Sequence, residues 1–466
     1  MLSPVYQKFP IVLEKGNGCY VWDLDGKQYL DLMGGYGVSL VGHSNEKVVE
    51  AIYNQATKLI SCHGSFYNEQ RSKTVKKLHK ITPKHLDNIY LCNSGKAALK
   101  LCKKNSTNKI MSMSGSYHGK TIGSLSLTWN PKYKKSFKPL LDNIEFITFG
   151  SVESLDQIDE NTGSVFLEVI QGESGVKFAS NEYFIKLQEQ CNKNNVLLVV
   201  DEIQTGLGRT GKMWAHEHYG LKPDILCIGK GLAGGLPVGA ILYRSDLLNF
   251  SLGEHTTTFG GNPLTSAATN ATIDYLLNEN LVDNAAKIGE IFLNGLSDLR
   301  SKYDFIRDVR GLGLMIAVES RFPIKDILYD ALSHGLIMLY SGKNIMGLSF
   351  LGGEAVIGVL AISAYSDYSK ANSDLVSFNK QYKSATDPGQ IADLRAKTLQ
   401  AEVDQISSND QMTMMIYAAG GLWAINVVHA FLTGPKADTA SRSSGFDLVY
   451  HPEMLQPQLR FSIALD

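Results

Sequence analysis

The chain has 466 residues, of which 44% are hydrophobic and 20% charged, and its formal net charge is -1. This is the composition of a soluble enzyme, and the length allows two or more domains. A net charge so close to zero argues against nucleic acid as the main partner.

The cysteines indicate neither a metal site nor disulfides, because none of the six forms a C-x-x-C pair. They lie scattered at Cys19, Cys62, Cys92, Cys102, Cys191 and Cys227. Reduced thiols in the cytoplasm fit this pattern best. The opening stretch, MLSPVYQKFPIVLEKGNG, lacks the apolar core of a signal peptide, so we expect a cytoplasmic protein.

The first predicted element is a β-hairpin, because Cys19–Leu32 alternates apolar and polar residues around Asp25-Gly26. From about Ile89 to Tyr243, short apolar runs alternate with longer amphipathic ones. Most of these runs are apolar throughout, as strands covered on both faces must be. The runs that read as strands are 88–94, 109–115, 144–150, 164–170, 196–202, 224–230 and 239–244.

Residues 181–195 have helical periodicity and separate two of these strands, which is the βαβ rhythm of a doubly wound sheet. Residues 262–303 are predicted to be helical, as a long connector. Residues 306–319 then read as two short strands of a smaller C-terminal domain.

The character of the chain changes near Asn344. Residues 345–365 carry one charge, Glu354, and residues 412–434 carry none. Both runs are apolar, and each is also long enough to span a bilayer. The stretch between them, 366–411, is polar and is predicted to be helical. We interpret the two runs as a membrane hairpin, with a pair of buried core helices as the alternative.

A carboxylate and an amine stand where two buried strands end. Asp201 follows VLLVV and Lys230 follows DILCIG, so both should point into the crevice beyond the carboxyl ends of the sheet. Such a pair suits a pyridine aldehyde cofactor, since the carboxylate keeps the ring nitrogen protonated and the amine binds the aldehyde. The alternative is a structural salt bridge, which is costly in a core without further partners.

The stretches DEIQTGLGRTG (Asp201–Gly211) and PDILCIGKGLAGGLPVGA (Pro223–Ala240) resemble the signature and the lysine region of the class III (ornithine-type) aminotransferases, which use pyridoxal 5'-phosphate (PLP). The resemblance covers Pro4 to about Asn344. It implies an α/β fold of the PLP-dependent transferase fold type I, a large doubly wound mixed sheet plus a smaller α+β domain. The tail would add two hydrophobic helices.

The domain boundaries that follow are 1–50 for the N-terminal part of the small domain and 51–265 for the large PLP-binding domain. Residues 266–344 would form the connector helix and a truncated C-terminal small domain. Residues 345–466 would form the tail. That tail resembles nothing in the family, and a natural fusion, an insertion or a misjoined gene model would explain it; we prefer the last.

The resemblance also implies roles in binding the cofactor. Lys230 would be the catalytic residue, forming the Schiff base and then moving the proton. Asp201 would pair with the pyridine nitrogen and Gln204 with the phenolic oxygen. Ile203 would pack on one ring face and Tyr117 would stack on the other, although for a tyrosine taken alone a core or rim aromatic is the better interpretation.

The phosphate would lie at Ser94, Gly95 and Lys96, where a strand leads into a helical run. An ordinary helix cap is the alternative, and the stretch lacks the family's acidic residue and is about one turn short. Thr258, in HTTTFGGNPL, matches a threonine that reaches the phosphate of the neighbouring subunit. A homodimer is therefore implied.

Three residues are implied for substrate binding: Lys120, Glu168 and Thr257. Lys120 replaces an arginine that grips a substrate carboxylate, and it offers a point charge rather than a fork. Glu168 could instead be a solvated carboxylate at a strand end. The family's second carboxylate-binding arginine, in text like I-R-x-L-P-P, is missing, and we interpret Arg310 as structural.

Within the family the chain is most similar to acetylornithine aminotransferases and to the archaeal branch that acts on lysine linked to LysW, an acidic carrier protein. This implies transfer of a terminal amino group to or from 2-oxoglutarate in arginine or lysine biosynthesis. The alternatives are an ornithine or 4-aminobutyrate aminotransferase, a semialdehyde aminomutase, or an inactive membrane-tethered binding protein.

Overall fold

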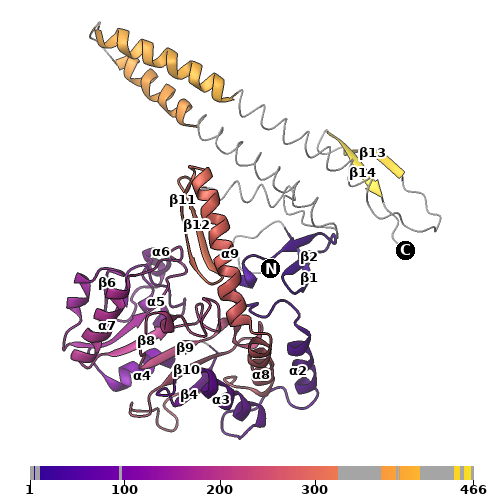
Figure 1. The fold of residues 1–466 in the computed structure, drawn as a ribbon, viewed down its shortest axis with the longest axis vertical. Helices are drawn as coiled ribbons and strands as arrows, with labels where there is room; N and C mark the ends of the chain where they lie inside the picture. Colours follow the sequence, from indigo (N-terminus) through magenta and orange to yellow (C-terminus); the bar gives the residue numbers. More distant parts are fainter. Residues whose placement is uncertain are drawn as a thin grey trace. The chain divides into compact units, whose positions relative to one another are not determined.

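The computed structural model describes residue 5 and residues 11–93, 97–323, 369–384, 387, 389–409, 445–451 and 456–462. Two compact units divide the chain, Met1–Met338 and Leu339–Asp466. The first unit contains the seven-stranded central sheet, β4 to β10 (Figure 1).

The predicted N-terminal hairpin is confirmed. Strands β2 (Tyr20–Asp23) and β3 (Gln28–Leu30) pair antiparallel, and β1 (Leu13–Asn17) adds a third strand. The turn between β2 and β3 forms because the Asp23 carboxylate accepts the backbone N–H groups of Asp25 and Lys27, while Gly26 adopts φ 77°.

All seven strands predicted for the central sheet are present. They are β4 (Asn88–Cys92), β5 (Lys109–Met113), β6 (Ile144–Ile147), β7 (Thr162–Leu167), β8 (Leu197–Asp201), β9 (Ile225–Ile228) and β10 (Gly239–Tyr243). Their order is β4-β10-β9-β8-β7-β5-β6. Only β10 runs antiparallel to both of its neighbours, so the sheet is mixed as expected.

The sheet is buried on both faces, which explains why its strands are apolar throughout. Along β8, Leu198 and Val200 belong to one hydrophobic cluster and Val199 to the other. Along β9, Leu226 and Ile228 join the first cluster while Ile225 and Cys227 join the second. Because side chains alternate across a strand, each cluster covers one face of the sheet.

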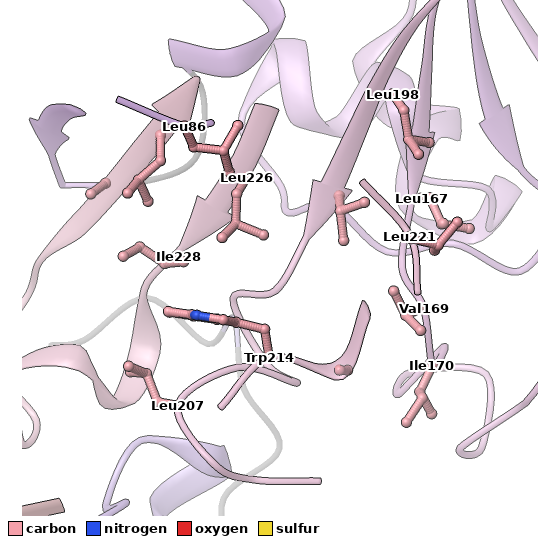
Figure 2. Close-up of a cluster of buried hydrophobic side chains, with 14 of the residues drawn as sticks. Leu86, Leu167, Val169, Ile170, Leu198, Leu207, Trp214, Leu221, Leu226 and Ile228 are labelled. Carbon is pink, nitrogen blue, oxygen red and sulfur yellow. The ribbon is translucent and has the colours of Figure 1, made fainter. Parts of the chain in front are cut away.

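Trp214 is the largest fully buried side chain of the first cluster, and Figure 2 shows its indole among the aliphatic residues drawn there. The indole nitrogen donates to the carbonyl of Ile81 at 2.6 Å, which satisfies its one polar group. The turn before Trp214 is closely packed, since a Cβ at Gly206 would meet the indole at 2.7 Å.

Helices complete the first unit, and α8 contacts α2, α3 and the short turn η4 (Lys230–Ala233). The predicted helix at 181–195 is confirmed as α7. The helices are α2 (Glu46–Ala56), α3 (Glu69–Ile81), α4 (Ala97–Asn105), α5 (Ile122–Leu127), α6 (Pro131–Lys134), α7 (Asn181–Lys193), α8 (Pro263–Asn278) and α9 (Leu281–Lys302), besides the turns α1 (Gly34–Gly37), η1 (Lys135–Phe137), η2 (Glu153–Gln157) and η3 (Ala215–His218).

The predicted helical connector at 262–303 is two helices rather than one. Asn280 adopts φ 49°, in the left-handed region, and this residue ends the run of helical hydrogen bonds between α8 and α9. The two strands predicted after it are present as β11 (Ile306–Leu312) and β12 (Met315–Ser320), which lie along α9 (Figure 1).

In the second unit, residues 369–384 and 389–409 are helical, as predicted for the polar stretch, and Gln405 donates to Asn372 across the pair. Strands β13 (Gly445–His451) and β14 (Gln456–Ser462) form a hairpin. Both hydrophobic runs, 345–365 and 412–434, lie outside the described residues. Among the residues that are described, no helix combines the length and the hydropathy needed to cross a membrane.

The contact between α9 and the β11–β12 turn gives a test of the packing. A Cβ at Gly289 would lie 2.1 Å from the carbonyl oxygen of Gly313, whereas a Cβ at Gly295 meets no atom within 4 Å. Glycine to alanine in an exposed helix normally stabilises by about 1 kcal/mol. We expect Gly289→Ala to lower the free energy of unfolding by about 1–2 kcal/mol, because overpacking outweighs the helical preference.

The control, Gly295→Ala, should raise the free energy of unfolding by about 0.5–1 kcal/mol, and urea unfolding followed by circular dichroism measures both variants. Equal shifts in the same direction would show that α9 does not pack against the turn in this way.

Candidate functional site

The carboxylate of Asp201 and the amine of Lys230 lie at the same edge of the sheet. Asp201 is the last residue of β8, and Lys230 follows β9, which pairs with β8 in parallel. Both side chains line a cavity of about 340 Å³. The expectation that the carboxyl ends of the two strands bring these groups to a common crevice is therefore correct.

Lys230 combines burial with a strained backbone. Burial lowers the pKa of its amine, although the negative charges of Asp201 and Glu168 oppose the shift. A lowered pKa makes the neutral, nucleophilic amine available closer to neutral pH. Lys230 also adopts φ 43°, which is uncommon for a residue with a side chain and is typical of functional sites.

Asp201 is held by His118, a residue to which the sequence analysis gave no role. His118 Nδ1 lies 2.8 Å from Asp201 Oδ2, and the two side chains are only 3% and 10% exposed. Burial by itself would lower the pKa of His118, but the hydrogen bond and charge of Asp201 outweigh burial, so the pKa is raised. The other Asp201 oxygen accepts the backbone N–H of Ile203 at 3.1 Å.

Glu168 is a second buried carboxyl group in the cavity wall. Its Oε2 accepts the backbone N–H of Tyr117 at 2.7 Å. Burial raises the pKa of Glu168 to about 7, although the charge of His118 lowers it. Glu168 therefore changes its charge near neutral pH, where a solvated carboxyl group would stay ionised.

Most of the predicted residues come together in this cavity, but not all of them. Those that line it are Tyr117, Lys120, Glu168, Asp201, Ile203, Gln204 and Lys230. Ser94, Gly95 and Lys96 lie outside the described residues, and α4 is described from Ala97.

The two predicted threonines do not line the cavity. Thr257 donates to Asn93 Oδ1 at 2.9 Å, and Asn93 is itself a lining residue. Thr258 is exposed. Arg310, interpreted as structural, pairs with Asp308 and Glu319 and donates to the carbonyl of Gly175.

The donor set fits a protonated aromatic ring that carries an aldehyde. A carboxylate, an amine and an amide converge on one space, and Ile203 and the ring of Tyr117 supply apolar surface around it. Among the described residues, no group lies within hydrogen-bonding distance of the buried His118 Nε2. A buried polar atom without a partner is unusual, and it marks this wall as one that a polar ligand can complete.

Comparison with known proteins agrees with this arrangement. The family model described as aminotransferase class-III matches residues 1–350. The chain is 42% identical over 343 residues to the LysW-aminoadipate semialdehyde/glutamate semialdehyde transaminase of Sulfurisphaera tokodaii, a match that covers 72% of this chain and 88% of that protein. It is 40% identical over 321 residues to the acetylornithine aminotransferase of Methanopyrus kandleri, covering 67% and 82%.

Among solved structures, the ornithine aminotransferase of Toxoplasma gondii superposes with a TM-score of 0.68 at 32% identity, covering 72% of this chain and 84% of that one. The family match ends near residue 350, so the second unit lies almost entirely outside it. The chain belongs to the class-III aminotransferases and is a transaminase that depends on pyridoxal phosphate.

Proposed function

We propose that this transaminase moves the terminal amino group of N-acetylornithine, or of a lysine linked to a LysW-type carrier, to and from 2-oxoglutarate in arginine or lysine biosynthesis. The observation that carries the proposal is 42% and 40% identity to relatives with these two activities. The exposed ammonium of Lys120 on the cavity wall supports it, because each of these substrates has a carboxylate. An ornithine or 4-aminobutyrate aminotransferase, or an aminomutase, is the alternative.

Lys230 is the proposed catalytic residue. When bound, PLP supplies an aldehyde that takes up the amino group and a ring that withdraws electrons from the adjacent carbon. The Lys230 Nζ, whose pKa is lowered by burial, would take a proton from the carbon that bears the donor amine and hold it for the second half of the transfer. Its place at the cavity wall supports this role.

Asp201 would hold the proton on the ring nitrogen, and His118 is proposed to hold Asp201 in position. The hydrogen bond between His118 Nδ1 and Asp201 Oδ2, at 2.8 Å, fixes the orientation of the Asp201 carboxylate. Ile203 and Tyr117 would cover the two ring faces, and Gln204 would donate to the phenolic oxygen. All five side chains line the cavity, which is what supports these assignments.

Glu168 is proposed to lie near the bound substrate. Since the pKa of Glu168 is raised to about 7, its carboxyl group can be neutral when an anionic substrate enters and so does not repel it. Thr257 is proposed to act in the same region through Asn93, to which it donates.

The phosphate is assigned to Ser94, Gly95 and Lys96, with Thr258 from a second copy of the chain completing it. The loop that carries Thr258 is tied to a neighbouring segment by Arg71, which donates to the carbonyls of Cys62, Phe66 and Gly261 at 2.8 Å each. Several large apolar side chains in the two segments that Arg71 joins are exposed: Leu59, Ile60, Phe66, Tyr67 and Phe259. A homodimer would cover them.

An acidic carrier protein would meet a basic segment beside the cavity. The segment formed by α6, η1 and the residue that follows η1 carries Lys132, Lys134, Lys135 and Lys138. Lys120 lies against the ring of Tyr133 in the same segment, so the basic surface reaches the cavity wall. Positive charge arranged in this way would steer an acidic partner towards the site.

The proposed domain boundaries near residues 50, 265 and 344 remain predictions. The membrane hairpin is supported only by the apolar composition of 345–365 and 412–434. Partition of the full chain with membranes, together with failure to bind PLP, would favour the alternative of an inactive tethered protein.

Initial rates with 2-oxoglutarate and a panel of N-acetylornithine, ornithine and 4-aminobutyrate test the proposed substrate. We expect the highest kcat/KM with N-acetylornithine. Lys120→Ala should raise its KM about fivefold with little change in kcat, because an exposed charged contact contributes about 1 kcal/mol of uniform binding. Lys193→Ala, which removes an exposed lysine at the end of α7, is the control and should leave KM unchanged. Faster turnover of ornithine or 4-aminobutyrate would contradict the proposal.

Co-expression of two differently tagged chains, Lys230→Ala and Thr258→Ala, tests the shared site. If Thr258 serves the other chain's site, a mixed dimer has one complete site and one with both defects. Random pairing should then restore roughly a quarter of wild-type activity, since half of the dimers are mixed. Purified mixed dimers no more active than the Thr258→Ala homodimer would show that the threonine does not act across an interface.

A further inference from the structure

A second cavity of about 440 Å³, which we call the outer cavity, adjoins the cofactor cavity. Its wall includes Tyr117, Trp129, Tyr133, Glu173 and Ser174. Tyr117 lines both cavities, so the two spaces lie next to each other at this residue. A substrate that reaches Lys230 with one end therefore has room beyond Tyr117 for its other end.

Tyr133 contacts two opposite charges, Glu173 in the wall of the outer cavity and Lys120 in the wall of the cofactor cavity. Its hydroxyl donates to Glu173 Oε1 at 2.6 Å. Its ring meets Tyr117 edge-on with 6.0 Å between centroids, and Lys120 Nζ lies 4.7 Å from the centre of the Tyr133 ring. The aromatic face thus holds the ammonium of Lys120 by a cation–π contact while the hydroxyl holds the carboxylate of Glu173.

Lys120 and Glu173 do not neutralise each other. Within the described part of the chain no ion pair joins them: Lys120 lies over the ring of Tyr133, and Glu173 accepts a hydrogen bond from the Tyr133 hydroxyl. The hydrogen bond to Glu173, together with burial, raises the pKa of Tyr133 to about 12, so the hydroxyl keeps its proton and remains a donor in neutral solution. The result is an exposed ammonium over the ring of Tyr133 and a carboxylate with one oxygen already occupied by the Tyr133 hydroxyl.

We propose that Tyr133 is a specificity-determining residue that makes the outer cavity prefer an acylated α-amino group over a free one. Lys120 would take the substrate's α-carboxylate. A free α-ammonium, as in ornithine, would seek Glu173, but the Tyr133 hydroxyl competes for that carboxylate. An amide nitrogen has no charge and loses little from this competition. The inference rests on the proposed function and names the residue that sets its donor preference.

The test measures binding of two unreactive probes to the PLP-loaded full chain by isothermal titration calorimetry. N-acetyl-L-norvaline and L-norvaline match the two kinds of donor but lack the terminal amine. An unchanged cofactor absorbance shows that the probe's α-amine stays out of the inner cavity. We expect Tyr133→Phe to tighten L-norvaline binding roughly fivefold, because Glu173 is released, and to change N-acetyl-L-norvaline by less than about twofold.

Two further variants keep the result interpretable. Glu173→Gln in the Tyr133→Phe background should remove the gain, since the released group is then neutral. Tyr53→Phe, which loses the hydroxyl of an exposed tyrosine on α2, should change neither affinity. Equal changes for both probes, or no change for L-norvaline, would overturn the inference. If the wild-type enzyme turned over ornithine fastest, the proposed function would be wrong. The binding measurements would still test the role of Tyr133, because they do not depend on turnover.

Discussion

The structure depends on keeping ionisable groups buried at the edge of an apolar sheet. Asp201, His118, Glu168 and Lys230 share one cavity wall, and isolated charges at such depth are expensive. Local hydrogen bonds offset this cost: Asp201 accepts from His118 and from a backbone N–H group, and Glu168 accepts from the backbone of Tyr117. The part of the burial cost that hydrogen bonds do not offset shifts the pKa values of Lys230 and Glu168, which are the groups that transamination can use.

The sheet makes this arrangement possible because it restricts polar groups to the ends of its strands. Residues inside β8 and β9 face two hydrophobic clusters, and only their carboxyl ends open into the cavity. Parallel neighbours are needed for this, since antiparallel strands would place Asp201 and the start of η4 at opposite edges. The fold and the chemistry are therefore linked through strand direction.

Much of this could be predicted from the sequence because the signals are local. The apolar runs predicted every strand of the central sheet. Asp201 and Lys230 could be identified because each directly follows one of these runs. The role of His118 was missed because its partner is 83 positions away, although His118 is next to Tyr117, which the sequence analysis did name. The Tyr133–Glu173 bond spans 40 positions and leaves no local pattern. The break at Asn280 was missed because helical periodicity continues on both sides of it.

The central claim is that the Lys230 amine is the group that bonds covalently with the cofactor. Borohydride reduction of the PLP-loaded full chain, followed by digestion and peptide mass spectrometry, measures this directly. The account predicts that the added cofactor mass lies on the peptide containing Lys230 and is absent from Lys230→Ala. A stable label on any other lysine, with position 230 unmodified, would contradict it.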